Sequence, residues 1–342
     1  MWGRTAAITA AAVVSTGALA STAVAAGGPP PPPTGVNGAK VSLFASGVRT
    51  PTSFAFGAGT VFAGDGGNKE KGLPNGGIFV LKGGKATLLK GSPPFVAGVT
   101  WHKGALYVSG GVVSKKGIAW QLQAWSGWNG KKFASKKVIW TAPKGLDGLN
   151  GIAFGPDGRL YVGVDVGLTN NNDHGPAKTP YVYKILSLKA NGTGPQVFAS
   201  GIRQPWQFAF ANGSSSPFVS ALGQDKGAKN PPDFVLKVKQ GDNYGFPKCN
   251  WIDKSKCKGF TKPWMFFPPH TDIMGLAIIG QRLYMTSFAG PSGGGTVYSM
   301  PLKGGKYSPV VTGFVAPTVG LGVHKGTLYV GELTGQVFSV KP

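Results

Sequence analysis

The clearest pattern in the chain is a phrase in which apolar and polar residues alternate, a turn follows, and the alternation resumes. Residues 150–165 show it best, because alternation over 152–154 is followed by the turn Pro156-Asp157-Gly158 and then by alternation over 160–162. Period-two alternation on both sides of such a turn predicts a β-hairpin. Similar phrases occur at residues 53–65, 98–110, 207–221, 275–287 and 320–332. A hairpin that recurs about every 40 to 50 residues is typical of a β-propeller.

A second, weaker hairpin follows each phrase, as at residues 77–90 and 181–199. Two hairpins per repeat give four strands, so the pattern predicts an all-β, six-bladed β-propeller with four-stranded blades. The last repeat ends at Pro342 after only three strands. We expect residues 41–45 to supply the missing strand, because pairing the two chain ends closes the last blade and removes an exposed sheet edge. Two β-sandwich domains would also explain the strands, but not their recurrence.

The composition agrees with many turns and short strands. The chain of 342 residues contains 56 Gly and 27 Pro, and 42% of its residues are hydrophobic, which excludes a wholly disordered chain. A chain of this length suits one large all-β domain as well as two ordinary ones.

The N-terminus is typical of a secretory signal peptide. Arg4 supplies a positive charge, residues 5–24 are uncharged and rich in Ala and Val, and Ala23-Val24-Ala25 is a small-residue cleavage site. We expect a signal peptide at 1–25, a stiff Pro/Gly-rich linker at 26–39, and the propeller at 40–342. The mature protein is then secreted and has no stable membrane span. A retained membrane anchor is the alternative, since the uncharged stretch is nearly long enough to span a bilayer.

The chain is strongly basic, with 35 Lys and Arg residues against 12 Asp and Glu. The lysines are scattered through turn sequences, whereas proteins that read nucleic-acid grooves cluster their basic residues and use Arg for bases. The pattern therefore favours a solvated cationic surface near anionic cell-envelope polymers over a nucleic-acid partner.

The two cysteines, Cys249 and Cys257, are close in the sequence. In an oxidising compartment such a pair forms a disulfide that closes one loop. No second Cys or His pair stands at zinc-ligand spacing, so a zinc site is not favoured, and two free thiols are the remaining alternative.

The strand order assigns loops to faces of the propeller. In a four-stranded blade, the segment before the first strand and the segment after the second emerge on one face. That face is expected to carry Arg49, Asp65, Asp147, Asp165, Arg203, Gln204, His270, Asp272 and Glu332. Its five carboxylates are suited to bind a cation, hydrogen-bond a sugar or act as acid and base. Alternatively, some of them cap turns, as Asp commonly does.

The loop at 167–180 is long and rich in oxygen-bearing side chains. It could ligate Ca²⁺ through carbonyl groups and Asp173, although its carboxylate spacing does not match an EF-hand loop. His174 in the same loop is a candidate base, but a lone loop histidine is more often simply solvated.

Two segments resemble the glucose/sorbosone dehydrogenase family. Residues 201–210, Gly-Ile-Arg-Gln-Pro-Trp-Gln-Phe-Ala-Phe, are similar to that family's Gly-Leu-Arg-Asn-Pro-x-Gly-x-Ala-Phe segment. Residues 231–233 and 241–249 resemble its Pro-Pro-Asp and Gly-x-Asn-Tyr-Gly-Trp-Pro-x-Cys segments, and residues 151–165 resemble its Gly-Pro-Asp-Gly hairpin. The resemblance implies a secreted six-bladed quinoprotein that oxidises sugars or other aldoses with pyrroloquinoline quinone (PQQ), often with Ca²⁺. In that family a His base takes a proton from the substrate, and Arg and Lys groups hold the cofactor's carboxylates.

The family's functional residues carry over only in part. Arg203 matches the cofactor-contacting Arg, and Gln204 stands where Asn is usual. The catalytic His is expected eight positions before Gly155, and Asp147 stands there. A carboxylate with an ordinary pKa near 3.9 is a weak base at neutral pH unless burial raises that pKa. His270 aligns with a His often found before the fifth blade, whereas the family's arginines after the fifth-blade hairpin are not evident at 287–291.

These observations leave three functional hypotheses. The first is a PQQ-dependent sugar or aldehyde dehydrogenase with altered catalysis, in which Asp147 or His270 is the base, Arg203, Gln204 and Arg49 hold the cofactor, and Asp165 and Asp173 ligate a cation. The second is a non-enzymatic propeller that binds envelope carbohydrate or protein with the same face, which the missing His favours. The third, a Ca²⁺-dependent lactonase-like hydrolase, depends on the acidic cluster.

Overall fold

The computed structural model describes residues 31–67, 75–115, 117–146, 148–165, 179–224, 229–290 and 293–342. The expected signal segment at 1–25 lies outside these residues. The regular secondary structure of the described residues is almost entirely β-strand, with one short 3-10 helix, η1 (Lys254–Cys257). None of the helices in these ranges has the length and hydropathy of a membrane span.

Most sheets follow the chain order of their strands. Three contain four antiparallel strands each. They are β7 (Phe95–His102), β8 (Ala105–Ser114), β9 (Gly117–Trp128) and β10 (Phe133–Thr141); β11 (Leu149–Phe154), β12 (Leu160–Val164), β13 (Lys184–Leu188) and β14 (Gln196–Ser200); and β15 (Pro205–Ala209), β16 (Phe218–Ala221), β17 (Asp233–Lys237) and β18 (Met265–Phe267). A fourth consists of β19 (Ile273–Ile279), β20 (Arg282–Ser287), β21 (Thr296–Pro301), β22 (Ser308–Thr312) and β1 (Thr34–Gly35).

The remaining sheet has eight strands and consists of two four-stranded units. One unit is β3 (Pro51–Gly57), β4 (Thr60–Asp65), β5 (Gly77–Lys82) and β6 (Gly84–Leu88), and the other is β23 (Thr318–His324), β24 (Thr327–Glu332), β25 (Gln336–Lys341) and β2 (Lys40–Ser46). A short parallel pairing between β2 and β6 joins them into one sheet.

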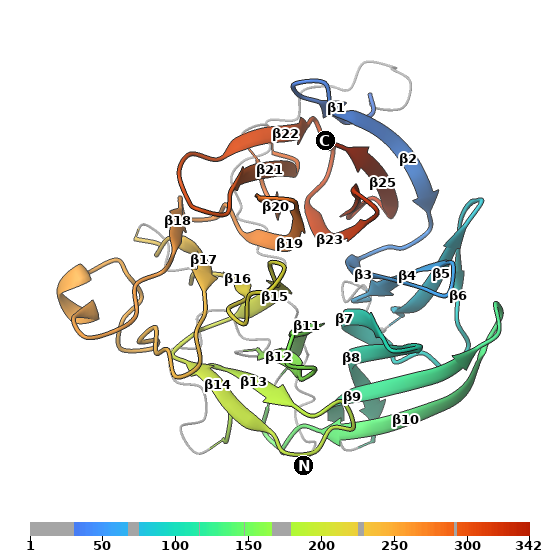
Figure 1. The fold of residues 1–342 in the computed structure, drawn as a ribbon, viewed down its shortest axis with the longest axis horizontal. Coiled ribbons are helices and arrows are strands. Elements are labelled where there is room, and N and C mark those ends of the chain that lie inside the picture. The colour runs from blue at the N-terminus through green and yellow to red at the C-terminus, as the bar shows by residue number, and fades with distance from the viewer. Residues whose placement is uncertain are drawn as a thin grey trace, which may run out of the picture.

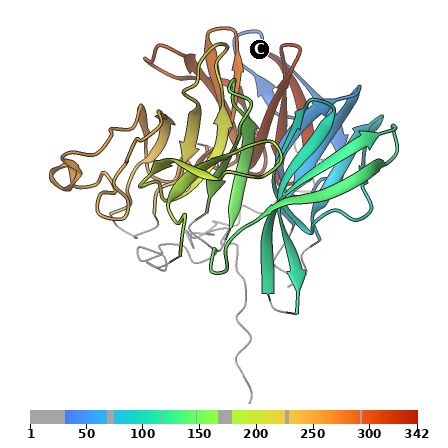
Figure 2. The same cartoon turned by 60° about the horizontal axis from the view of Figure 1, so that its bottom comes forward.

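The sheets surround a central axis (Figure 1). The first strands of the hairpin phrases, β3, β7, β11, β15, β19 and β23, lie nearest this axis, and each packs against the next, with β23 returning to β3. The turned view shows the sheets standing side by side around it (Figure 2). The hydrophobic core lies between neighbouring units; for example, Phe62 of β4 and Trp125 of β9 are fully buried in one cluster. The arrangement is that of a propeller.

The two ends of the chain pair as the sequence predicts. β2 is antiparallel to β25, with Val41 opposite Val340. The linker prediction at 26–39 needs a correction, because Thr34 and Gly35 form β1 and pair with Thr312 and Val311 at the edge of the fourth sheet. Backbone pairing at that open edge draws the end of the expected linker into the folded domain.

Buried polar side chains join neighbouring units at the axis. The inner strand of each unit is a sheet edge, and its backbone groups need partners. Hydroxyl and amide groups donate across these edges to carbonyl oxygens of the next unit: Thr52 to Val96 (2.7 Å), Ser109 to Asn150 (2.7 Å), Asn150 to Pro205 (2.9 Å), Ser220 to Met274 (2.6 Å) and Thr286 to Val319 (3.0 Å).

One position of the repeat is crowded at the axis and is usually glycine. A Cβ atom on Gly98 would lie 2.9 Å from the Cα of Gly151, and one on Gly320 would lie 2.7 Å from the carbonyl oxygen of Pro51. Gln207 stands at this position in β15 and is buried. Its Nε2 donates to the Thr52 carbonyl of β3 (2.8 Å), and its Oε1 accepts from the Leu276 N–H of β19 (3.3 Å). Gln207 therefore crosses the axis, and a cavity of about 320 Å³ adjoins it.

We expect Gln207→Ala to lower the free energy of unfolding by about 1–3 kcal/mol, because it leaves the Thr52 carbonyl and the Leu276 N–H without their partner. Urea unfolding followed by tryptophan fluorescence measures this change. Gln196→Ala, on the exposed face of β14, is the matched control and should change stability by less than about 0.5 kcal/mol. Equal unfolding midpoints for the two variants would contradict the bridging role.

Candidate functional site

The best-defined polar cluster lies where three connecting segments meet at one end of the inner strands. Arg203 and Gln204 come directly before β15, Gly223 follows β16, and His270 and Asp272 precede β19. Because β15 and β19 are neighbours around the axis, these segments from two adjacent units lie together. The structure thus brings Arg203, Gln204 and His270 into one region, as their predicted face requires.

Arg203 is held in a fixed position although its side chain is long. Its exposed fraction is only 6%, and its Nη1 donates to the Gly223 carbonyl oxygen and to Oε1 of Gln204 (3.1 Å). The Leu222 N–H donates to the Gln204 carbonyl (3.3 Å), which fastens the segment before β15 to the segment after β16. A buried, pre-oriented guanidinium is well suited to bind an oxygen-rich anion.

Asp233 is the residue of this cluster that sequence reasoning missed. It is the first residue of β17 and is 1% exposed. Its Oδ1 accepts from the Gly223 N–H (2.7 Å) and its Oδ2 accepts from the Asp272 N–H (2.8 Å). The only sequence signal was its place in the Pro-Pro-Asp segment, which suggested a family but no role.

The environment of Asp233 raises the pKa of its carboxyl group. Burial, and then the negative charge of Asp272, raise the pKa of its carboxyl to about 7, against the opposing effects of its two backbone hydrogen bonds and the positive charge of Arg203. A buried carboxyl whose pKa is raised within a polar cluster is a candidate functional group.

The turn before β19 has an unusual backbone. His270 and Asp272 both adopt positive φ, at 62° and 45°, a conformation that costs non-glycine residues energy. Several contacts hold it: Asn230 Nδ2 pairs with His270 Nε2, the Thr271 hydroxyl donates to the Pro268 carbonyl (2.8 Å), and the Phe288 N–H donates to the Asp272 carbonyl (2.9 Å). Backbone strain of this kind persists where the surrounding structure over-determines it, often at functional sites.

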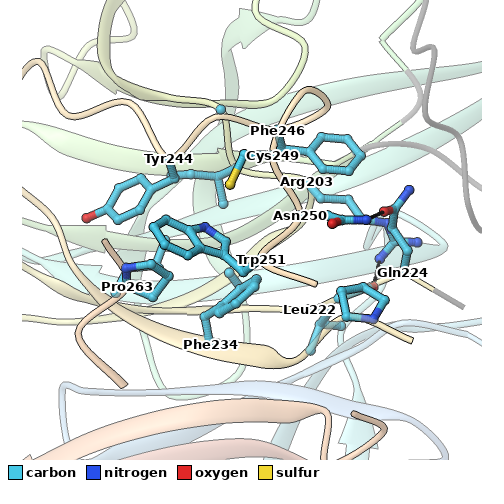
Figure 3. Close-up of a pocket in the computed structure, with 16 residues that line it drawn as sticks. Arg203, Leu222, Gln224, Phe234, Tyr244, Phe246, Cys249, Asn250, Trp251 and Pro263 are labelled. Atoms are coloured by element: carbon cyan, nitrogen blue, oxygen red, sulfur yellow. Dashed lines mark hydrogen bonds between the residues drawn. The ribbon is translucent and has the colours of Figure 1, made fainter. Parts of the chain in front are cut away.

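A pocket opens beside Arg203. Figure 3 shows Arg203, Gln224 and Asn250 together on one side, with Tyr244, Trp251 and Phe234 on the other. Gln224 is 4% exposed, and Asn250 Nδ2 donates to its Oε1 (3.1 Å), which directs the Gln224 amide nitrogen elsewhere. Within the described ranges that buried nitrogen has no hydrogen-bond partner. The pocket therefore has a guanidinium and two amide side chains next to aromatic rings.

One cysteine of the predicted disulfide, Cys249, lines this pocket. Cys249 and Cys257 are bonded, and their loop carries η1 at the rim of the molecule (Figure 1). The N-cap of η1 is Asp253, whose side chain accepts from the Ser255 N–H (3.0 Å). The disulfide thereby fixes the segment that supplies Asn250 and Trp251.

Other residues predicted for this face serve the backbone. Asp65 is 1% exposed and accepts from the N–H groups of Arg49 (2.9 Å) and Gly67 (2.8 Å). Glu332, also 1% exposed, accepts from the Ala316 N–H (2.9 Å) and the Thr334 hydroxyl (2.7 Å). For these two carboxylates the contacts match the capping alternative: they cap the segments that enter and leave their own units.

Two predicted residues lie in other units. Arg49 is exposed and precedes β3, on the opposite side of the axis from β15 (Figure 1). Asp165 follows β12, and its N–H donates to the Gly148 carbonyl (3.0 Å). Neither residue belongs to the cluster around Arg203 and Asp233.

The remaining candidates, Asp147, Asp173 and His174, lie outside the described residues. Within the described ranges, no group of three or more His, Cys, Asp and Glu side chains could hold a metal ion.

The chain has the fold of known sugar dehydrogenases. No family model matches the chain, and no curated protein matches it. Among solved structures, an oxidoreductase from Thermus thermophilus described as a glucose dehydrogenase is 20% identical, with 89% of this chain and 100% of that chain covered and a TM-score of 0.70. The PQQ-bound aldose sugar dehydrogenase from Streptomyces coelicolor is 18% identical over 90% of this chain and 99% of its own, with a TM-score of 0.66.

A fungal enzyme shares the fold as well. A Trichoderma reesei member of carbohydrate-active enzyme family AA12 is 14% identical over 91% of this chain and 98% of its own, with a TM-score of 0.71. The resemblance to the glucose/sorbosone dehydrogenases that the two sequence segments indicate is therefore matched in three dimensions over most of the chain. The protein has the β-propeller fold of the soluble PQQ-dependent aldose and glucose dehydrogenases.

Proposed function

We propose that the protein is a secreted, PQQ-dependent dehydrogenase of sugars or other aldoses, with Asp147 at the position of the family's catalytic His. The observation that supports this most is the buried Arg203, which Gly223 and Gln204 hold beside a pocket on a fold shared with PQQ-bound enzymes. We also propose that the four-stranded units count as six blades and that residues 1–25 are a cleaved signal peptide.

The polar side chains of the cluster suit the edge of the cofactor, while the pocket beside them is small, about 30 Å³. PQQ carries carboxylates and quinone carbonyls, so its edge consists largely of hydrogen-bond acceptors. The cluster offers the opposite chemistry, with the Arg203 guanidinium and a buried Gln224 amide nitrogen that has no partner in the described part of the chain. An unsatisfied buried donor costs about 1–3 kcal/mol, a cost that a bound acceptor removes. Arg203, Gln204 and Gln224 would hold the cofactor there.

The positions of these residues assign separate roles to the cofactor, to Arg203 and to a base. When bound, PQQ supplies the oxidation of a substrate hydroxyl by taking up a hydride equivalent. Arg203 supplies positive charge and a fixed donor geometry. Proton removal falls to a base, for which Asp147 and the exposed His270 are the candidates. Because Asn230 pairs with Nε2 of His270, the orientation of that imidazole is set before substrate binds.

Calcium forms part of the proposal on two grounds. A calcium structure exists for the Trichoderma reesei relative, and Asp165, Asp173 and loop carbonyl groups are the oxygen donors that this chain offers. We propose that Arg49, across the axis from Arg203, contributes positive potential at this face.

A second candidate function is a non-catalytic sugar-binding propeller. The presence of Asp147 at the position of the catalytic His favours it, since an ordinary carboxylate is a poor base at neutral pH. The same face and pocket would then bind sugar without turnover.

We expect the mature protein to bind PQQ at micromolar concentration in the presence of Ca²⁺, as measured by the absorbance of the bound cofactor, and to reduce a dye with one or more aldoses. Arg203→Lys keeps the charge but loses the planar fork, so PQQ binding should weaken about tenfold or more. Arg282→Lys is the matched control, because Arg282 also donates to a neighbouring group, Ser299 (2.8 Å), but lies outside the cluster. Absence of PQQ binding by the unmodified protein at these concentrations contradicts the proposal.

We expect Asp147→His to raise the rate of aldose-dependent dye reduction at pH 7 on the order of tenfold or more, since an imidazole is a better matched base at that pH. The PQQ dissociation constant should stay within about threefold of the original. Steady-state kinetics on the PQQ-loaded protein measure the rate. Binding of PQQ and sugar without turnover in either protein would support the sugar-binding candidate instead.

A further inference from the structure

We propose that Asp233 is a positioning residue that ties the Arg203 segment to the His270 turn, and that this bridge opens when its carboxylate takes up a proton. The inference rests on the proposed function only for its effect on cofactor binding. The bridge itself is a property of the described residues.

The bridge follows from the connectivity of two hydrogen bonds. Gly223, whose N–H donates to Asp233 Oδ1, is the residue whose carbonyl accepts from Arg203. Asp272, whose N–H donates to Asp233 Oδ2, lies two residues after His270. One carboxylate therefore connects the cofactor-side arginine with the candidate base, and it does so across two units, since Gly223 belongs to the β15–β18 unit and Asp272 leads into β19.

Protonation would remove one side of this bridge. An ionised carboxylate only accepts hydrogen bonds, and both of its oxygens are used here. Adding a proton turns one oxygen into a hydroxyl, which is a weaker acceptor, and it removes the charge that strengthens both bonds. The bonds that hold the Gly223 segment and the Asp272 turn are then weakened, and the more weakened of the two segments opens.

The charges facing Asp233 come from both sides of the bridge. Arg203, before β15, favours the ionised form, and Asp272, before β19, disfavours it. Because burial and Asp272 outweigh the favourable contacts, folding raises the pKa of this carboxyl from its ordinary 3.8 to about 7. The native state then binds more protons than the unfolded state between these values, so Asp233 lowers the free energy of unfolding as pH rises through this window. Ionised Asp233 therefore lowers the free energy of unfolding, as expected of a group that serves function and not stability.

Backbone strain in the His270 turn favours a change of conformation once the hydrogen bond to Asp233 is lost. His270 and Asp272 hold positive φ values that cost non-glycine residues energy, and the Asp233 bond is one of the contacts that maintain them. Losing this bond lets the turn relax and changes where His270 lies relative to Arg203.

Asp65 provides a matched comparison within the same chain. It is as buried as Asp233, at 1% exposure, and it also accepts from two backbone N–H groups. Both of its donors, however, lie in the segments that flank the β3–β4 hairpin of one unit. A change at Asp65 therefore affects stability without linking Arg203 to His270.

The test is amide hydrogen exchange on the full mature protein, expressed as protection factors that correct for the intrinsic rate at each pH. In the unmodified protein we expect protection at Gly223 or Asp272 to fall about tenfold or more between pH 8.5 and pH 5, with a midpoint near neutrality. In Asp233→Asn, the protection factor of the released amide should be as low at pH 8.5 as it is at pH 5. Asp272→Asn retains the carboxylate of Asp233 but removes the neighbouring charge, so the midpoint should move to lower pH. Asp65→Asn should leave protection at Asp272 unchanged.

Constant protection at both amides between pH 5 and 8.5 would overturn the proposal, as would equal loss of protection at Asp272 in Asp65→Asn. The PQQ dissociation constant is the second readout, and it should rise about tenfold in Asp233→Asn at pH 8.5 relative to Asp65→Asn. An unchanged constant together with a lost bridge refutes the positioning role. If the unmodified protein binds no PQQ, the proposed function fails, while the exchange data still decide whether the bridge exists.

Discussion

The structure depends on how the inner edge of each sheet is satisfied. A sheet edge presents unpaired N–H and C=O groups, and at the axis of this protein the inner edges of the sheets face one another. Buried side-chain hydroxyls and amides, such as Thr52, Asn150 and Ser220, donate to carbonyl oxygens of the next unit. A buried carbonyl left without a donor costs more than an ordinary hydrogen bond contributes, so each inner strand is fixed relative to its neighbour.

This constraint determines where chemistry can occur. Once the inner strands are fixed, the segments that enter β15 and β19 must emerge side by side at the same end. Arg203 and His270 are thereby placed in one region although they are far apart in the sequence. Gln207 adds to this rigidity, because its amide connects β15 to β3 across the axis. The cluster at this end is consequently built on a stiff support, while its own turn before β19 is strained.

Much of the fold can be predicted from the sequence, because each repeat contains alternating apolar and polar residues on both sides of a turn. The strand near residues 41–45 and its pairing with the last repeat follow from counting strands, and the disulfide follows from two nearby cysteines. The end of the expected linker differs from the prediction, because the sequence of Thr34 and Gly35 has no strand pattern. These residues form a strand because they pair with the open edge of β22.

The site is less predictable, for a physical reason. Sequence position assigns a carboxylate to a face but does not reveal its partners. The sequence left open whether Asp65 and Glu332 bind a ligand or cap turns, and in the structure both accept hydrogen bonds from nearby donors. Asp233 begins β17 after two prolines, and its second donor, Asp272, comes from the next unit. Asp233 connects two units, and does not simply cap its own segment, because β17 packs beside the turn before β19.

The most direct test of the account is a crystal structure of the mature protein soaked with PQQ at pH 8.5. The account predicts density for the cofactor in contact with Arg203 and Gln224, with both Asp233 hydrogen bonds in place. Cofactor density in the axial cavity beside Gln207, or at any place that leaves Arg203 untouched, would contradict it.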